Sequence, residues 1–532
     1  MRVSTSQIYN IATLGMSQAQ AAIVKTEEQI ASGKRVLSPA DDPVAAANIL
    51  QLNQDLARTE QYKKNIDIAD NSLSLEETNL QSIVDLMQRM RELAVKAGNT
   101  AVYTSSDYKS LAAEVDTRID ELMNLQNTRN ASGQYIFAGY QGDTQPFVNK
   151  GGGNYVYMGD EGQLRLQASA SVSVAVSDSG KKLFVDIPSG HNTINTSASS
   201  ANRALPAAII SVGEVIDQEV FDKFYPEDMV ITFNAPSAAA VPPAANYTVT
   251  ERSTGKILVA NATYIKGEAI EVNGVRLSIS GSPVPPTPAN LPFNFNAAAA
   301  PIDFSLAPAT FKITVNGRTE TFTVDSVVNN ATDFAAALNS AAIVPPNIIS
   351  NADKLNNLGL TVTAAGIVSE SGKNISVHSG NANLDNAAGF STSTGVTSTN
   401  GVAGDSFFVE STNKQGLLTT LSRFSEAMKT VKDTPESKAV LAEIVAKTLT
   451  NLTNSITNTV AVQGEVGARQ NTLESSKDLN LDVVLFSKQT LSNLESLDVA
   501  EATIRLSMQS LVLTASQQSF AKVSQLTLFS YL

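Results

Sequence analysis

The chain has 532 residues and a net charge of −13, and it contains neither cysteine nor tryptophan. This length allows about three or four domains, and an acidic chain without a basic block is a poor candidate for binding nucleic acid or an anionic membrane. The lack of cysteine excludes disulfides, thiolate zinc sites and cysteine nucleophiles. The N-terminus has no apolar signal-peptide core and no stretch reaches the ~18 apolar residues of a membrane span, so we expect any export to proceed without a cleaved signal.

The N-terminal end of the chain is predicted to form a coiled-coil helix. In the first 30 residues, apolar and small side chains recur at alternating spacings of three and four, which is the pattern of a coiled-coil seam. The members of this seam are Tyr9, Ala12, Met16, Ala19, Ile23, Thr26 and Ile30.

Further helices are predicted on both sides of the middle region. Residues 44–97 and 468–532 contain neither glycine nor proline, the residues that interrupt helices. In the first of these segments a row recurs every seven residues: Ala45, Leu52, Thr59, Ile66, Leu73, Leu80, Met87 and Ala94. A third helix is expected to begin at Ser105 or Ser106 and to turn one face inward, with Tyr108, Leu111, Val115, Ile119 and Leu122. Residues 414–460 are also predicted helical, and 468 to about 528 is predicted as one long helix.

The last predicted helix is apolar on two sides. One row has the members Leu497, Ile504 and Leu511, and a second row has the members Val499, Leu506, Leu513 and Phe520. The rows are offset by two residues, roughly 200° around a helix. A helix that is apolar on two sides must be covered on two sides. We therefore expect one row to pack within the subunit and the other to form a seam between subunits.

The middle of the chain, about 148–405, is predicted to be rich in β-strands. Residues 270–279 and 311–324 alternate apolar and polar side chains around Asn-Gly, a strong hairpin signal, and 154–167 and 246–260 look similar. The proline-rich stretch 283–301 fits a linker between two small β domains. The only histidines, His191 and His378, lie in this region without a nucleophile motif, and we expect both to be exposed. The fold class is therefore α+β: a long α-helical coiled-coil or bundle rod formed by both chain ends, with inserted β-rich domains.

The stretch "ASGKRVLSPADDPVAAA" (31–47) is predicted to be a capped turn between two helices. A phosphate loop needs an earlier glycine and a preceding strand, and a metal site at Asp41 and Asp42 needs further oxygen ligands. Neither is present. Gly33 suits a left-handed helix C-cap, and Ser38-Pro39, or Asp42-Pro43, suits an N-cap followed by proline at the first helical position.

Several motifs resemble the flagellin superfamily. These are "SGKRVLSPADDPVAAA", "LMQRMRELAVKAGNT" (86–100), "SGQYIFAGYQGDTQPF" (132–147), "VGARQNTLE" (466–474) and "LSNLESLDVAEATIRL" (491–506). The ends "MRVSTSQIY" and "SQLTLFSYL" are similar to the branch of hook-filament junction proteins known as hook-associated protein 3. The resemblance covers about 1–147 and 414–532, and the middle region is larger than in compact members.

The resemblance implies a structural protein of the bacterial flagellum, exported through the flagellar type III apparatus. Its expected partners are the first hook-filament junction protein, flagellin, other copies of itself in a helical layer, and a cytoplasmic export chaperone. The alternatives are a flagellin filament subunit, or a flagellar surface protein with an adhesive or immune-exposed β insert. The implied domains are 1–42 with 485–532 (terminal coiled coil, inner tube), 43–147 with 406–484 (helical wall), and the β-rich inserts 148–287 and 302–405.

We expect no enzyme activity, catalytic residue, cofactor or metal. The predicted assembly contacts are Tyr9, Met16, Ile23, Ile30, Lys34, Arg35, Asp41, Asp42, Leu497, Val499, Ile504, Leu506, Leu511, Leu513 and Phe520. By resemblance to flagellin, Arg89, Leu93 and Glu114 match positions that contact an innate immune receptor, although an ordinary salt-bridged helix surface explains them as well.

Overall fold

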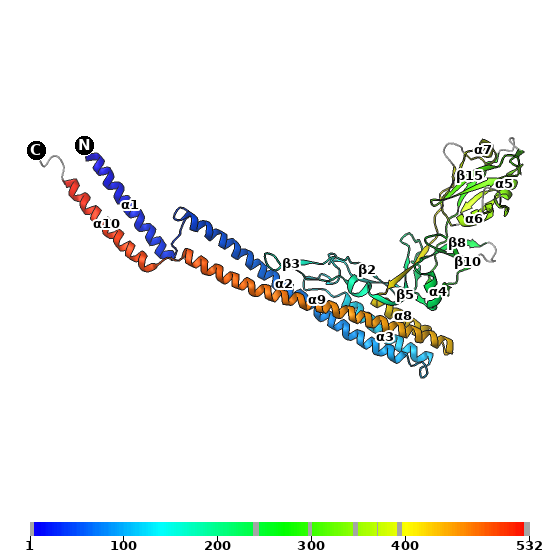
Figure 1. Ribbon diagram of the computed structural model, residues 1–532, viewed down its shortest axis with the longest axis horizontal. Coiled ribbons are helices and arrows are strands. Elements are labelled where there is room, and N and C mark those ends of the chain that lie inside the picture. The colour runs from blue at the N-terminus through cyan, green and yellow to red at the C-terminus, as the bar shows by residue number, and fades with distance from the viewer. Residues whose placement is uncertain are drawn as a thin grey trace. The chain divides into compact units, whose positions relative to one another are not determined.

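The computed structural model describes residues 5–237, 244–295, 301–343, 349–369, 371–390 and 396–525 (Figure 1). The fold is α+β, and the chain divides into two compact units. The first unit comprises residues 1–75, 164–176 and 465–532, and the second comprises residues 76–163 and 177–464. Helices α2 (Pro43–Ala97) and α9 (Pro435–Glu495) contribute to both units. None of the helices in the described segments combines the length and the hydropathy needed to cross a lipid bilayer.

In the first unit, α1 (Thr5–Ser32) packs along α10 (Val499–Gln525). The predicted seam of α1 is confirmed from Ala12 onward, because its members are half-buried or, at Thr26, buried. A short hairpin, β3 (Arg165–Gln167) and β4 (Ser173–Ala175), also belongs to this unit. It is fixed to both long helices by side-chain amides: Asn65 of α2 donates to the carbonyl of Gln167, and Asn480 of α9 donates to that of Ala168.

The prediction of one helix from 468 to about 528 is wrong. Helix α9 begins at Pro435 and runs through Gly464 and Gly467, and the helix breaks at residues 496–498 before α10 begins. The cost of a glycine, about 1 kcal/mol in a helix interior, is small for a helix of 61 residues. The break has a local cause, because the Asp498 carboxylate accepts the N–H groups of Ala500 and Glu501 and thereby caps a new helix.

The heptad row of α2 and the inward face of α3 are confirmed. Every member of the α2 row is buried except the half-buried Leu52, and all five predicted residues of α3 (Ser105–Gln126) are buried. Thr104 caps α3 through a reciprocal capping box with Asp107. Helix α3 packs against α8 (Leu417–Thr430), so these helices and the adjoining parts of α2 and α9 form the helical part of the second unit (Figure 1).

The first β region begins with the hairpin β1 (Phe147–Gly151) and β2 (Asn154–Tyr157), followed by the short helical turn η1 (Lys181–Val185). Its five-stranded antiparallel sheet has the order β10-β9-β8-β22-β5. These strands are β5 (Pro188–Ala198), β8 (Met229–Ser237), β9 (Ala244–Glu251), β10 (Ile257–Thr263) and β22 (Ser406–Lys414). A smaller sheet with helix α4 (Gln218–Phe224) completes the region and contains β6 (Ile209–Ile210), β7 (Glu214–Val215), β11 (Ala269–Val272) and β12 (Val275–Ser280). Their shared core includes Ile194, Phe221, Phe233, Ile279 and Phe407.

The second β region, within residues 289–397, has its own apolar core. One of its sheets has the order β16-β15-β20-β21 and another has the order β13-β19-β18. The core is dominated by aromatic rings, including Phe311, Phe322, Phe334 and Phe390. The elements are β13 (Ala289–Pro292), β14 (Ile302–Asp303), β15 (Ala309–Val315), β16 (Arg318–Val324), β17 (Val327–Val328), α5 (Ala331–Leu338), α6 (Asn351–Leu358), β18 (Leu360–Thr363), β19 (Gly366–Ser369), β20 (Ile375–Ser379), α7 (Ala382–Ala388) and β21 (Val396–Thr397).

Three of the four predicted hairpins are confirmed. Strands β11–β12 and β15–β16 pair across Asn273-Gly274 and Asn316-Gly317, whose positive φ angles are those of a type I′ turn, and β9 pairs with β10. The hairpin predicted within 154–167 is wrong, because β2 pairs with β1 and β3 pairs with β4. The Asp160 carboxylate accepts the N–H groups of Tyr140 and Gly162 between these strands, which turns the chain there.

Two other predicted segments have a different structure. The stretch 283–301 is only partly a linker, because Ala289–Pro292 is strand β13 and Leu291 is fully buried in the second core. Proline is tolerated there because β13 is an edge strand; residues 296–300 lie outside the described segments. Residues 406–414, which we assigned to the helical wall, form strand β22 between β8 and β5.

The second β region contains a buried carboxylate whose ionisation is predicted to destabilise it. Both oxygens of Asp385 are buried and accept no hydrogen bond from the residues that the structure describes, and burial raises the pKa of Asp385 above 3.8. The protonated form is favoured in the fold, so stability is lost as the pH rises past that value. We expect Asp385→Asn to raise the melting temperature at neutral pH but not below pH 3.8. Thermal unfolding between pH 3 and 7 measures this, with the exposed Asp325→Asn as control; an equal gain at every pH contradicts the prediction.

Candidate assembly site

The loop after α1 pairs with the break between α9 and α10, and we call this pairing (residues 33–42 with 494–498) the joint. Gly33 follows the last residue of α1 with φ +69°, as predicted for a left-handed C-cap. The Gly33 carbonyl accepts the Leu497 N–H at 3.0 Å, and the Arg35 N–H donates to the Glu495 carbonyl at 2.7 Å. These bonds form a one-residue antiparallel bridge between Lys34 and Ser496. The joint therefore connects the two ends of the chain.

Ion pairs surround this backbone pairing. Lys34 contacts Glu495 at 2.9 Å, Arg35 contacts Asp42 at 3.2 Å, and Lys25 contacts Asp41 at 2.5 Å. The Arg35 guanidinium also donates to the Leu494 carbonyl. The predicted polar contacts Lys34, Arg35, Asp41 and Asp42 are thus already engaged within one chain, and their role between subunits stays a prediction.

The two aspartates hold the loop in its turn. Asp42 caps α2 by accepting the Ala45 N–H, with Pro43 at the first helical position, as expected. A helix start at Ser38 is wrong, because the Asp41 carboxylate turns back to accept the N–H groups of Leu37 and Ser38. The hydrogen bond from Lys25 and those N–H groups lower the pKa of Asp41 to about 2. Its stabilising contribution is therefore present above pH 3.8 and is lost as the pH falls towards 2.

Alternative ligands for this loop find no support in its geometry. The cations Lys34 and Arg35 face carboxylates of the same chain, and the loop follows a helix and not a strand. In the part of the chain that the structure describes, no three acidic or histidine side chains lie close enough to hold a metal ion.

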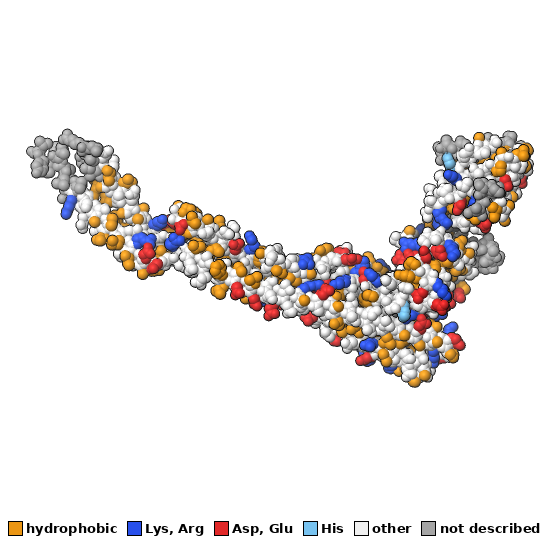
Figure 2. Space-filling model, viewed as in Figure 1, with side chains coloured by type: hydrophobic (Ala, Val, Ile, Leu, Met, Phe, Trp, Pro, Cys, Tyr) orange, Lys and Arg blue, Asp and Glu red, His pale blue; other side chains and the backbone are white. Residues whose placement is uncertain are grey.

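Helices α1 and α10 bury one face against each other and expose a second apolar face. Leu506, Leu513 and Phe520 turn towards α1, where Phe520 meets the Tyr9 ring edge-on at 4.7 Å. Ile504 and Leu511 are 66% and 65% exposed. The two-sided character predicted for the last helix is confirmed. Other exposed apolar residues on the pair are Ile11, Leu14, Val24, Met508 and Val512, and apolar side chains are visible on the surface of this segment (Figure 2).

Two members of the predicted rows lie elsewhere. Leu497 precedes α10 and is buried at the joint, because Asp498 starts the helix after it. Val499, the first residue of α10, is exposed. On α1, Met16, Ile23 and Ile30 are half-buried as expected, whereas Tyr9 keeps 49% of its surface exposed.

The proposed immune-receptor positions are only partly on the surface. Arg89 pairs with Glu92 and with Glu114 at 2.9 and 3.0 Å, which raises the pKa of Arg89. Leu93 is buried in the helix packing and is therefore not available to a receptor, so this part of the predicted contact is wrong. The two histidines, His191 on β5 and His378 on β20, are exposed, as expected.

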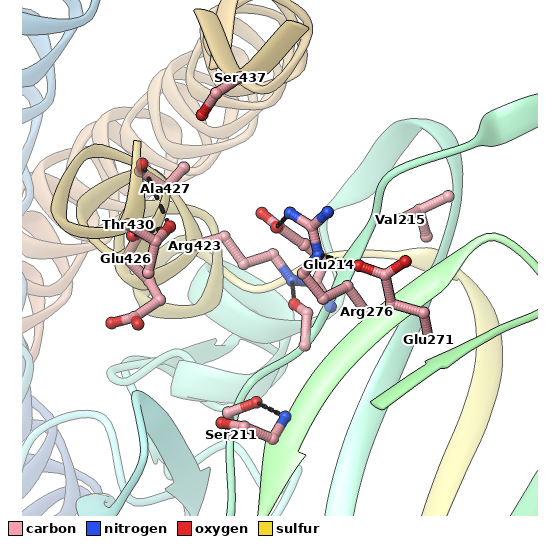
Figure 3. A network of polar contacts seen from close by, with 12 residues as sticks. Ser211, Glu214, Val215, Glu271, Arg276, Arg423, Glu426, Ala427, Thr430 and Ser437 are labelled. Carbon is pink, nitrogen blue, oxygen red and sulfur yellow. Dashed lines mark hydrogen bonds and ion pairs between the residues drawn. The ribbon is translucent and has the colours of Figure 1, made fainter. Parts of the chain in front are cut away.

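A buried arginine attaches the first β region to the helices of the second unit, and sequence analysis missed it. Arg423 of α8 is 6% exposed, and burial lowers its pKa to about 10 (Figure 3). Among the residues that the structure describes, every acceptor of its guanidinium is neutral. The acceptors are Gly213 O (2.7 Å), Ile194 O (2.6 Å), Val212 O (3.4 Å), Thr193 Oγ1 (2.6 Å) and Gln415 Oε1 (2.8 Å).

Replacing Arg423 is predicted to loosen this attachment. Arg423→Met leaves several buried carbonyls without a donor, at a cost of roughly 3 kcal/mol. We expect faster amide exchange in residues 190–215 of the full chain, with unchanged exchange in the second β core. The control is Arg118→Met, which removes a half-buried arginine paired with Glu121 on α3. Equal exchange in the two variants contradicts the prediction.

Comparisons with known proteins agree with this arrangement of helices. The family described as "Bacterial flagellin N-terminal helical region" matches residues 3–142. The chain is 36% identical over 189 residues to flagellar hook-associated protein 3 of Escherichia coli, covering 36% of this chain and 58% of that protein. It is 33% identical over 116 residues to a flagellin of Listeria monocytogenes, covering 22% of this chain and 38% of that flagellin. The chain thus spans less than two thirds of the length of these curated relatives.

Among solved structures, a flagellar hook-associated protein 3 from Legionella pneumophila matches 84% of this chain and 98% of its own length, with 21% identity and a TM-score of 0.42. The family match spans α1, α2 and α3, and the chain is similar to flagellar hook-associated protein 3.

Proposed function

We propose that this protein is a structural subunit of the bacterial flagellum that forms the layer connecting the hook to the filament. The main observation is the two-sided terminal pair, in which α1 and α10 pack on each other and still expose apolar rows. The chain is 36% identical to hook-associated protein 3 over 189 residues, whereas the flagellins are less similar, at 33% over 116 residues in Listeria and 28% over 178 residues in Bacillus subtilis. This difference favours a junction subunit over a filament subunit.

The exposed rows supply the energy for assembly. Burying a large apolar side chain contributes about 1.5–3 kcal/mol, so covering Ile504, Met508, Leu511 and Val512 contributes roughly 6–12 kcal/mol per subunit before the entropy of association. We propose that other copies of the chain in the same layer cover these residues. The neighbouring layers would be the first junction protein on the hook side and flagellin on the filament side.

The proposed route places the subunit outside the cell at the end of the hook. Export through the flagellar apparatus in an unfolded state, with a chaperone on the terminal segments, fits a chain whose ends expose apolar side chains in the isolated subunit. In this proposal the two β regions are non-catalytic and exposed. An adhesive role for them is a separate hypothesis.

The test of the junction role is a strain that lacks this protein. We expect such cells to keep their hooks and to release flagellin monomers into the medium, because the filament has no layer on which to grow. Electron microscopy of hooks and immunoblotting of culture supernatants measure this, and restoration by the intact gene is the control. Filaments of normal length on the mutant hooks contradict the proposal, and so does spontaneous growth of the purified protein into long filaments.

The exposed row of α10 gives a second prediction. Ile504→Glu with Leu511→Glu is expected to abolish motility and to leave the melting temperature of the isolated subunit within about 1 °C, because both side chains are exposed there. The matched control, Ser510→Glu with Gln517→Glu, adds the same charge to an exposed polar strip of the same helix and is expected to remain motile. Normal motility of the Ile504/Leu511 variant contradicts the proposed seam.

A further inference from the structure

The second unit contains an open cavity of about 560 Å³ beside the buried arginine (Figure 3). Its walls come from β7, β11 and β12 on one side and from α8 and the start of α9 on the other. Its charged lining consists of Glu214, Glu271, Arg276, Arg423, Glu426, Lys432 and Glu436. A concave site of this size suits a small ligand or a single side chain.

Two of the three cations in the cavity are already committed to this chain. Arg423 is buried, and all three of its guanidinium nitrogens donate to protein acceptors. Arg276 lies between two carboxylates, at 2.7 Å from Glu271 and 3.5 Å from Glu214. Neither arginine is therefore available to an anionic ligand.

The acidic side chains are less well neutralised. In the described segments, Glu426 and Glu436 form no ion pair, and they come from different helices. Glu214 is mostly buried, and desolvation raises its pKa. The charges of Arg276 and Arg423 oppose this rise, and the negative charge of Glu426 adds to it. A cation placed between carboxylates that line the same cavity lowers the electrostatic repulsion between them.

Part of the remaining lining is aliphatic, beside the hydroxyl groups of Ser211, Ser278, Thr430, Thr434 and Ser437. Ala427, Val431, Leu441 and Ile444 are buried on the helical side, and Leu277 is buried on the sheet side. A hydrated inorganic ion gains nothing from such a wall, and the described residues include no cluster that fits a metal. A methylene chain gains contact with it, as the stems of lysine and arginine do when they lie along apolar surface.

We propose that this cavity binds an alkylammonium group, with the charge at Glu426 and Glu436 and the methylene chain against the aliphatic wall. Lys432 also lines the cavity, is exposed and forms no ion pair in the described segments, so we expect it to compete for the same carboxylates. The proposal is independent of the junction role, since it concerns a site at the base of the first β region.

Calorimetric titration of the full-length protein with 1,5-diaminopentane tests this site. We expect saturable binding to the native protein and about tenfold weaker binding to Glu426→Gln with Glu436→Gln, which corresponds to ~1.4 kcal/mol. Lys432→Gln is expected to bind a few times more tightly than the native protein, because the competing cation is gone. This gain does not depend on the stability of the double variant.

The controls separate specific binding from general attraction to an acidic protein. Glu121→Gln with Glu443→Gln removes the same charge from exposed positions outside the cavity and is expected to bind like the native protein. Pentanol is expected not to bind because it lacks the positive charge. Tetramethylammonium is expected not to bind because it lacks the methylene chain. A lysine-containing tripeptide that binds more tightly than the diamine identifies a protein side chain as the source of the group, and the reverse order identifies a free polyamine. Equal affinity of the native protein and the Glu426/Glu436 variant for the diamine overturns the proposal.

Discussion

The structure of the first unit depends on the backbone pairing at the joint. Two hydrogen bonds connect residues 33 and 35 to residues 497 and 495, positions more than 450 residues apart in the chain. They set where α1 ends and where α10 begins, so that the seam of one helix meets the packed row of the other. The surrounding ion pairs between Lys34 and Glu495 and between Arg35 and Asp42 are partly exposed, and each contributes little. Backbone bonds and helix caps, and not charge pairs, therefore fix this register.

A second constraint holds the first β region on the helices. Burying a cation without a hydrogen-bonded carboxylate costs desolvation free energy. Hydrogen bonds from Arg423 to neutral acceptors in three separate parts of the chain offset this cost. Its charge is balanced at longer range by Glu214, which is linked in turn to Arg276 and Glu271. The same alternation of charges forms one wall of the open cavity, so the attachment of the β region and the chemistry of that cavity share their residues.

Periodicity and turn chemistry were enough to predict most of the regular structure. The heptads of α2 and the Asn-Gly turns are local signals, because each specifies a face or a turn without reference to the rest of the chain. The break before α10 also had a signal, since Asp498 and Glu501 have the spacing of a capping box. Arg423 had none. Glu426, three residues later, suggests an ordinary surface pair, and only the fold shows that all its acceptors except Gln415 lie more than 200 residues away.

The outer row of α10 links the fold to the proposed function. Ile504 and Leu511 are exposed to water in the isolated subunit and contribute little to its stability. An exposed apolar row of this kind favours association. The inner row already closes the pair with α1, so the outer row is free to contact another molecule without opening the subunit. The joint makes this possible, because it starts α10 at Asp498 and so determines which of the two rows faces outward. Moving that start by one residue would rotate the rows by about 100°, and the inner row would then no longer face α1.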